Sequence, residues 1–364
     1  MCAKKTTMRD IAKAANVSQS TVSMILNGKS ASFPAATIEK VLKTAAAMNY
    51  SLPQTPASFA GSTVLVITVQ LTNPYYAAMQ QGVDRAAFPH SINVITACSY
   101  HDPALEASFL QMAVSLNLLG VIFLYPPDNF EAFQSTRTQI PIVTVCDRAS
   151  EVPGDIVELN NFEAGVLTAR HLLNLGHTNI AVLSHASDRI TTSRATRVAG
   201  ILAEIRQALS EEHLLLLTGN NSQTRYLKEN SLHYHVGYSL AQNQKIYQNN
   251  ITGLICVNDM LAYGVMDALA EKGYRIPEDF SVVGSDNLLF SGMSCVSLTT
   301  VEHRPDLVAE TALATLLNRL QMRTSLGTTS FQTKCQPTLI PRGSTGPVRS
   351  DPLGKQSVTA PSRP

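Results

Sequence analysis

The chain has 364 residues, of which 45% are hydrophobic and 15% are charged. This composition is typical of a globular protein, and the length predicts more than one domain. The net charge of +1 hides an uneven distribution, because residues 1–50 hold seven Lys or Arg against two Asp or Glu. This segment therefore carries +5 and the rest of the chain −4. A basic head on an acidic body indicates a small nucleic-acid-binding module joined to a larger domain with another task.

Several classes of protein are disfavoured by the same sequence. The first apolar run is interrupted by Arg9, Asp10 and Lys13, so no secretory signal is predicted, and no apolar run is long enough to span a membrane. We therefore expect a cytoplasmic protein without a membrane partner. The cysteines lack any CxxC or Cys/His spacing, which favours reduced, buried thiols over metal ligands, and we expect neither a metal nor another cofactor. The six are Cys2, Cys98, Cys146, Cys256, Cys295 and Cys335.

Residues 7–27 have the pattern of a helix-turn-helix. Thr7 can cap a first helix, with Asp10 placed for the reciprocal contact, and Ser18 can cap a second helix. Small polar side chains on the second helix suit a DNA major groove, although a helical hairpin from an ordinary bundle is the alternative. Met8, Ile11, Ala12, Ala15, Val22, Ile25 and Leu26 are expected to face inward, and Gln19, Ser20, Thr21, Ser23 and Met24 outward.

A third helix completes the head. Asn27 and Gly28 end the second helix, and Pro34 suits the first turn of the next one. We expect a helix-turn-helix domain at residues 1–50, followed by a hinge linker at residues 51–62 that contains two prolines and no charge. The third helix is expected to turn Ile38, Val41, Leu42, Ala45 and Met48 inward.

From residue 63 the pattern changes to apolar strands that alternate with amphipathic helices. This alternation is typical of doubly wound parallel sheets, and the strands are too many for one sheet, so we predict a two-lobed α/β core at residues 63–345. The segment from residue 346 to 364 is rich in Pro, Ser and Gly, and we expect a disordered tail there. Expected strands are 63–69, 92–98, 120–125, 140–147, 179–185, 214–219, 252–259 and 280–287; expected helices are 74–87, 104–118, 162–175, 194–209, 234–244 and 260–272.

Polar residues follow several of the predicted strands. Parallel sheets bind ligands beyond the carboxyl ends of their strands, so these residues are candidates for a ligand site. A lone acid at a strand end can equally cap the following helix, and both interpretations apply to Asp128 and Asp147. The candidates at this edge are Asn73, Asp128, Asp147, Asn258, Asp259 and Asp286.

Over residues 6–345 the chain resembles the lactose/galactose-repressor (LacI/GalR) family of bacterial transcription regulators. The head segment MRDIAKAANVSQSTVSMILNG is similar to the family's opening sequence throughout. The core matches family segments in the same order: NPYYAAMQQGV (73–83), HLLNLGHTNIAVL (171–183), NDMLAYGVMDAL (258–269), RIPEDFSVVGSDN (275–287), LTTVEHRP (298–305) and PRGST (341–345).

The resemblance implies a fold, an activity and partners. The core should be a pair of periplasmic-binding-protein-like lobes that bind a small effector between them, by family default a sugar or a sugar derivative. The protein should be a homodimeric repressor that reads a pseudo-palindromic operator in double-stranded DNA, since each half-site takes one recognition helix.

The resemblance also assigns DNA-binding residues. Gln19 and Ser20 lie where the family reads bases, and glutamine can read adenine through two hydrogen bonds. Met24 replaces the family's usual arginine, a guanine reader, so we predict an operator that differs from the family consensus at that step. The remaining DNA-binding candidates are Thr7, Ser18, Thr21, Ser23 and Asn27.

The hinge departs from the family as well. Family hinges form a short helix on DNA whose leucine enters the minor groove, and the corresponding position here is Phe59. Phenylalanine can act as such a wedge. Pro56 would cost that helix a hydrogen bond outside its first turn, so a plain flexible linker is the alternative.

Of the eight effector-binding candidates, six follow from the resemblance, and Asp128 and Asp147 follow from their place at strand ends. Tyr75 and Tyr76 lie where family aromatic residues pack on the effector, although two tyrosines in a helix's first turn can also pack locally. Arg197 matches an effector-clamping arginine, and Asp286 matches an acid that accepts ligand hydroxyls or amines. The segment 158–161 lacks the family's Asp-Asn pair, which leaves the effector chemistry open. The other four candidates are Asp128, Asp147, Asn258 and His303, the last in place of a more usual glutamine.

Two further classes of function compete with a regulator. A solute-binding transport component would suit the core alone, but it needs a secretory signal where the basic head stands. An enzyme would need a catalytic constellation, and the sequence has no nucleophile elbow, phosphate-cradling Gly-rich loop or metal-ligand spacing. We therefore predict a regulator and not an enzyme.

Overall fold

The computed structural model describes residues 7–26, 33–48, 61–147, 152–186, 192–220, 229–322 and 330–349. The chain divides into two compact units, Met1–Phe59 and Ala60–Pro364. The hinge candidates Pro56 and Phe59 and the DNA-binding candidate Asn27 lie outside the described residues.

The first unit is a small bundle of three helices with the predicted caps. The Thr7 side chain accepts a hydrogen bond from the backbone N–H of Asp10, and the Asp10 carboxylate accepts one from the Thr7 N–H at 2.9 Å. Ser18 Oγ accepts from the Thr21 N–H at 3.0 Å and so begins the second helix. The helices are α1 (Met8–Ala15), α2 (Gln19–Leu26) and α3 (Ala35–Ala47).

One inward position predicted for α3 is wrong. Leu42 is 49% exposed, whereas Val41 and Ala45 are buried against α1 and α2. Adjacent residues of a helix point about 100° apart, so Leu42 cannot share the narrow face on which Val41 packs. Ile38 and Met48 pack partly buried at the edge of the same small core, as expected.

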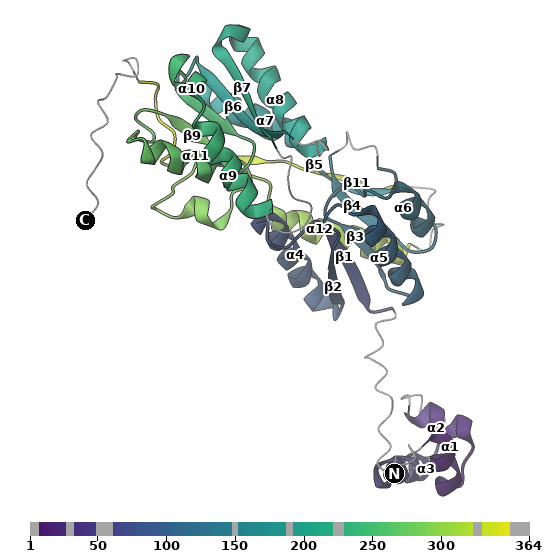
Figure 1. The fold of residues 1–364 in the computed structure, drawn as a ribbon. Helices are drawn as coiled ribbons and strands as arrows, with labels where there is room; N and C mark the ends of the chain where they lie inside the picture. Colours follow the sequence, from purple (N-terminus) through teal and green to yellow (C-terminus); the bar gives the residue numbers. More distant parts are fainter. Residues whose placement is uncertain are drawn as a thin grey trace, which may run out of the picture. The chain divides into compact units, whose positions relative to one another are not determined.

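The N-terminal lobe of the second unit is a six-stranded parallel sheet between helices (Figure 1). Successive residues of β1 (Thr63–Thr68) enter opposite cores. Val64 and Val66 pack under α4 (Pro74–Ala87) and α12 (Pro305–Gln321), while Leu65 and Ile67 pack under α5 (Pro103–Ser115) and α6 (Phe130–Arg137). This is why the strands read as continuous apolar runs. The strand order is β11 (Gln332–Cys335), β5 (Asp155–Leu159), β4 (Ile142–Cys146), β3 (Gly120–Phe123), β1 and β2 (Asn93–Cys98).

The C-terminal lobe repeats this plan with a four-stranded parallel sheet. Its helices α7 and α8 cover one face, and α9, α10 and α11 cover the other. The strand order is β7 (Leu214–Asn220), β6 (Ile180–Ala186), β8 (Gly253–Cys256) and β9 (Ser281–Val283); the helices are α7 (Asn161–Asn174), α8 (Thr192–Ala208), α9 (Glu229–Ala241), α10 (Gln244–Gln248) and α11 (Asp259–Glu271). Short 3₁₀ helices are η1 (Phe88–His90), η3 (Glu211–His213) and η4 (Leu289–Gly292).

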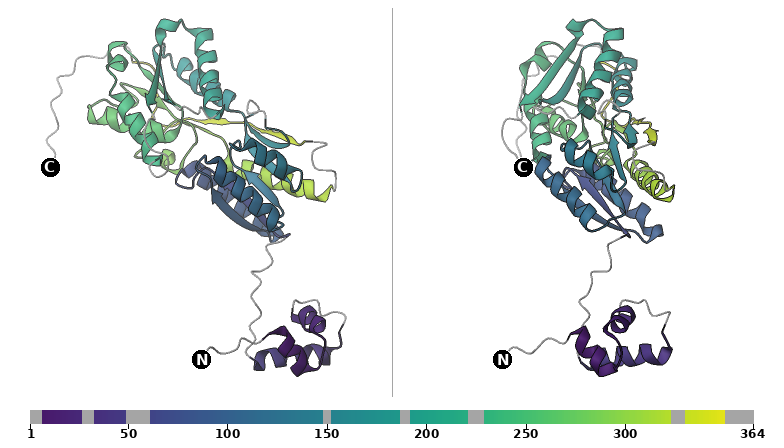
Figure 2. Two further views of the ribbon diagram at one scale, coloured as in Figure 1. Left: turned by 45° about the vertical axis from the view of Figure 1, so that its right-hand side comes forward. Right: turned by 90° about the vertical axis from the view of Figure 1, so that its right-hand side faces the viewer.

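The chain passes between the lobes from β5 to α7, from β10 (Thr300–Glu302) to α12, and from β11 to β12 (Thr338–Ile340). The strands β10 and β12 form an antiparallel pair of their own. Both views in Figure 2 show α12, the last long helix of the chain, alongside the lobe that contains β1. The predicted α/β fold with two parallel-sheet lobes is therefore confirmed.

Residues 346–349, which we expected at the start of the disordered tail, instead attach to the C-terminal lobe. The Val348 N–H donates to the Leu175 carbonyl at 2.9 Å, and the Arg349 guanidinium donates to Asn250 Oδ1 at 2.7 Å. The predicted start of the tail is therefore too early. The composition does not reveal these contacts, because their partners lie far away in the sequence.

Two further expectations concern thiols and membranes. Cys146, Cys256 and Cys335 are buried free thiols as predicted, but Cys295 is exposed because it lies in the surface loop after η4. Among the described helices, none combines the length and the apolar character that crossing a membrane requires.

Candidate functional site

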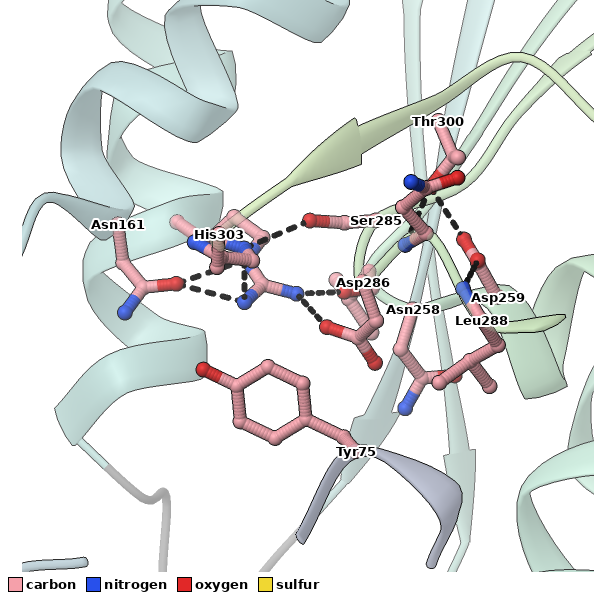
Figure 3. A network of polar contacts seen from close by, with 12 residues as sticks. Tyr75, Asn161, Asn258, Asp259, Ser285, Asp286, Leu288, Thr300 and His303 are labelled. Atoms are coloured by element: carbon pink, nitrogen blue, oxygen red, sulfur yellow. Dashed lines mark hydrogen bonds and ion pairs between the residues drawn. The ribbon is translucent and has the colours of Figure 1, made fainter. Parts of the chain in front are cut away.

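A buried arginine from the C-terminal lobe is the centre of a polar cluster (Figure 3). Arg197, on α8, is only 8% exposed. Its Nε and Nη2 donate to the side-chain oxygen of Asn161 at 3.0 and 2.6 Å, and its Nη1 donates to the Val257 carbonyl. Its Nη2 lies 3.1 Å from His303 Nε2, and its Nη1 lies 3.5 Å from a carboxylate oxygen of Asp286. Because every nitrogen of the guanidinium has a partner, its position is fixed.

Asp147 and Asn161 connect this arginine to the other lobe. Asp147 follows β4 of the N-terminal lobe, and its carboxylate accepts from the Asn161 side-chain amide at 3.0 Å and from the Asn161 N–H at 3.3 Å. Burial raises the pKa of Asp147, although these hydrogen bonds and the charge of Arg197 oppose the shift. Sequence reasoning missed Asn161, whose only signal was its place in the segment 158–161 that departs from the family pattern.

Asp286 is held in a strained conformation beside Arg197. Its φ angle of 138° lies in a region that residues with a Cβ avoid, and such strain is concentrated at functional sites. Burial raises the pKa of Asp286 to about 7, even though the nearby Arg197 lowers it. Its carboxyl group is therefore poised between the neutral and the charged form near neutral pH, and a bound donor can favour the charged form.

A second acid, Asp259, holds the loop that carries Asp286 in place. Asp259 is fully buried at the start of α11 and accepts hydrogen bonds from the Leu288 N–H, at 2.9 Å, and from the Ser291 and Thr300 hydroxyls. Asp259 therefore uses its acceptor capacity on the protein itself. It positions Asp286 and is not available to a ligand.

Tyr75 and His303 close the cluster from the two lobes. The Tyr75 ring, from the first turn of α4, meets the His303 ring edge to face with 6.1 Å between centroids. Figure 3 shows its hydroxyl on the side of Asn161. Burial and the charge of Asp286 raise the pKa of Tyr75, so its hydroxyl stays protonated as a donor. Tyr76 packs edge-on to Tyr75 and against both cores of its lobe, as the local-packing alternative expects.

The other two predicted effector residues have different partners. Asn258 caps α11 by accepting from the Leu261 N–H at 2.9 Å, and its amide contacts His233. Asp128 pairs with His101 at 2.7 Å, and its N–H donates to the buried carboxylate of Glu106. The structure thus gathers Tyr75, Asp147, Arg197, Asp286 and His303, together with Asn161, into one cluster.

The chemistry of this cluster is binding chemistry. It offers a fixed guanidinium, two carboxyl groups of raised pKa and a neutral imidazole, whose pKa burial lowers well below its usual value. The Ser285 hydroxyl lies 3.2 Å from His303 Nε2, but burial and the charge of Arg197 lower the pKa of this imidazole, so it is a weak base for activating the hydroxyl. Across the residues that the structure describes, no group of three His, Cys, Asp or Glu side chains could hold a metal ion.

On the head, α2 presents the side chains predicted to contact DNA. Gln19 and Ser20 are exposed, and Met24 is 42% exposed. The hydroxyl of Ser18 lies 2.7 Å from that of Ser20 and 2.8 Å from that of Thr21, which holds the start of α2 together. The Thr7 hydroxyl takes part in the cap of α1, and Thr7 remains exposed to solvent.

Known protein families match both the head and the core of the chain. Residues 7–52 match the model of "bacterial regulatory proteins, lacI family", and residues 169–345 match the periplasmic binding protein-like domain. The chain is 29% identical over 321 residues to a repressor named PurR from Mannheimia succiniciproducens, covering 86% of this chain and 92% of that protein.

Solved structures show the same fold. A LacI family transcriptional regulator from Enterococcus faecium with bound ribose has a TM-score of 0.64 and 22% identity, covering 79% of this chain and 100% of that one. The Lac repressor bound to ONPG has a TM-score of 0.71 and 23% identity, covering 94% of this chain and 100% of that one.

A helix-turn-helix head that matches the lacI family model thus precedes a two-lobed core of the periplasmic-binding-protein type. These proteins are regulators and not enzymes. The chain belongs to the LacI family and is a DNA-binding transcriptional regulator with an effector-binding core.

Proposed function

We propose that this regulator is a repressor whose operator affinity is set by a sugar or a sugar derivative bound at the Arg197 cluster. One observation carries the proposal: Arg197, Asp286 and His303 meet Tyr75 and Asp147 of the other lobe. Hydroxyl groups of a sugar can donate to the carboxylates and accept from the guanidinium, and the Tyr75 ring can pack on the sugar's apolar face. The repressor named PurR and the regulator with bound ribose support this assignment by likeness.

The ligand can act because its partners come from both lobes. A molecule that binds one relative arrangement of the lobes better than another shifts the population toward it. Asp147 and Tyr75 move with the N-terminal lobe, while Arg197 and Asp286 move with the C-terminal lobe. Effector binding is therefore coupled to the angle between the lobes, and through it to the DNA-binding heads of a dimer.

On DNA, we assign base reading to Gln19 and Ser20 and phosphate contacts to Ser18, Thr21 and Ser23. Thr7 and Asn27 are assigned to the ends of the same contact surface, and Phe59 to a minor-groove wedge. Each head takes one half-site, so a homodimer requires a pseudo-palindromic operator in double-stranded DNA.

Met24 gives the experiment that tests DNA recognition. We expect selection from a random DNA library to enrich a palindromic site with the wild-type protein, and Met24→Arg to add a preference for guanine at one position of each half-site. Binding should weaken steeply with salt, since phosphates are neutralised on binding. Recovery of the same sequence with both proteins would contradict the role of Met24, and recovery of none would contradict DNA reading itself.

The homodimer has a candidate surface on the C-terminal lobe. Leu289, Phe290 and Met293, in and beside η4, are 78%, 47% and 41% exposed, and such an apolar group is unusual on a monomer. We expect the Leu289→Asp/Phe290→Asp protein to sediment as a monomer and to bind operator at least about tenfold more weakly. Leu116→Asp, at a 45% exposed position after α5, is the control and should remain dimeric. A dimeric double variant would place the interface elsewhere.

A further inference from the structure

Two buried histidines, separate from His303, face each other in the C-terminal lobe. His185, near the carboxyl end of β6, is 6% exposed, and neither of its ring nitrogens has a hydrogen-bond partner among the described residues. An unsatisfied buried polar group costs about 1–3 kcal/mol, so such a side chain points to a partner that the protein alone does not supply.

His233, on α9, faces His185 with 4.1 Å between ring centroids. It is 8% exposed, and its Nδ1 lies 2.8 Å from the side-chain nitrogen of Asn258. Asn258 uses its side-chain oxygen to cap α11, so its amide nitrogen must donate to Nδ1. The proton of neutral His233 therefore lies on Nε2, which leaves this N–H as the donor of the ring.

Charge decides what kind of partner fits. Burial lowers the pKa of His185 to about 3 and that of His233 well below its usual value, and the positive charge of Arg194 on α8 lowers both further. Both rings are thus neutral at neutral pH, and each offers one N–H donor within reach of the Arg194 charge that lowers their pKa values. Arg194 disfavours a metal ion, and an oxyanion is the group that accepts from both donors and is attracted to the arginine.

The pair adjoins the Arg197 cluster. Asn258 lies beside Asp286 in Figure 3, and the charge of Arg194 acts on Asp286 as well as on the two imidazoles. A ligand that contacts Arg197 and Asp286 can therefore extend toward the histidines.

We propose that His185 and His233, together with Arg194, form a subsite for an oxyanion of the effector, a phosphate or a carboxylate. The proposal rests on the effector-binding function of the Arg197 cluster and adds the chemical class of one substituent. Neither histidine is among the residues that the family resemblance assigns to the effector.

Inorganic phosphate and acetate are the probes, each compared with chloride at equal ionic strength by thermal unfolding of the full chain. We expect one of them to stabilise the wild-type protein saturably, and His185→Phe to weaken its apparent affinity about tenfold or more. Stabilisation by phosphate assigns a phosphate-bearing effector, and stabilisation by acetate a carboxylate. The control is His235→Gln, at an exposed position of α9, which should respond like the wild type.

The chloride reference tests a purely structural role for His185. Since its ring makes no hydrogen bond to the described residues, His185→Phe should unfold in chloride at the wild-type temperature or higher. A lower unfolding temperature, equal stabilisation of both proteins, or no stabilisation of the wild type would overturn the subsite. Operator binding is measured separately: a protein that binds no DNA but keeps the His185-dependent effect contradicts the proposed function and leaves the subsite standing.

Discussion

Replacing Gly165 with alanine should destabilise the C-terminal lobe by about 3 kcal/mol, at the upper end of the usual cost of overpacking. Gly165 lies on α7 where this helix crosses α8, and a Cβ there would stand 2.0 Å from the Arg197 carbonyl oxygen and 2.8 Å from the Ile201 nitrogen. These are backbone atoms, so the two helices must separate. The displaced segment carries Arg197, and we expect the effector response to be lost together with stability.

Urea unfolding measures the change in the free energy of unfolding of Gly165→Ala. The sign of this change separates overpacking from helix propensity. Alanine is a better helix former than glycine by about 1 kcal/mol, so helix propensity alone would stabilise the variant. The control is Gly292→Ala, where the nearest atom to the new Cβ lies 3.8 Å away. If Gly165→Ala and Gly292→Ala unfold at the same urea concentration as the wild type, the close approach of α7 and α8 is contradicted.

Asp286→Asn should change how the stability of the protein depends on pH. Burial raises the pKa of Asp286 from 3.8 to about 7, so the folded protein keeps a proton that the unfolded chain has released. The stabilisation from this proton is complete below pH 4 and is lost as the pH rises through 7. Asparagine does not titrate, so the free energy of unfolding of Asp286→Asn, relative to wild type, should rise by about 2–3 kcal/mol between pH 5 and pH 8.

The opposite behaviour is expected of Asp279→Asn. The guanidinium of Arg275, which holds the Asp279 carboxylate, lowers its pKa, so this acid stabilises the fold at neutral pH and the contribution disappears as the pH falls. The two variants thus have pH slopes of opposite sign relative to wild type. A flat difference for Asp286→Asn would show that its carboxyl group is charged in the fold at all these pH values.

Local sequence chemistry was enough for much of the fold. The bounds of α4 were predicted at both ends, because Asn73 caps it, Pro74 begins it and an apolar period runs to Ala87. Thr7, Asp10 and Ser18 likewise cap the helices they were expected to cap. The helix α12 was not predicted, although the sequence contains its signals. Pro305 suits its first turn, and its inward face repeats at helical spacing through Val308, Ala309, Ala312, Leu313 and Leu316.

The remainder depends on contacts between distant residues. β11 is an edge strand with three exposed polar residues, so nothing in its own pattern separates it from a loop. Asn161 meets Arg197 across 36 positions, and Arg197 meets Val257 across 60. The sequence likewise did not predict the partners of Asn258 and Asp128. The sequence can place polar groups at strand ends, but only the packing of the two lobes decides which of them meet.

A ligand held by Arg197 should set the affinity of the protein for its operator. The direct measurement is the Kd of the full chain for its selected operator, with and without sugars, sugar phosphates and purines, for wild type, Arg197→Met and Arg206→Met. Arg206 lies on the same helix but forms a surface ion pair with Glu211. We predict equal Kd values without ligand, a change of about tenfold or more with one compound for wild type and Arg206→Met, and no change for Arg197→Met. An undiminished response of Arg197→Met would contradict the claim.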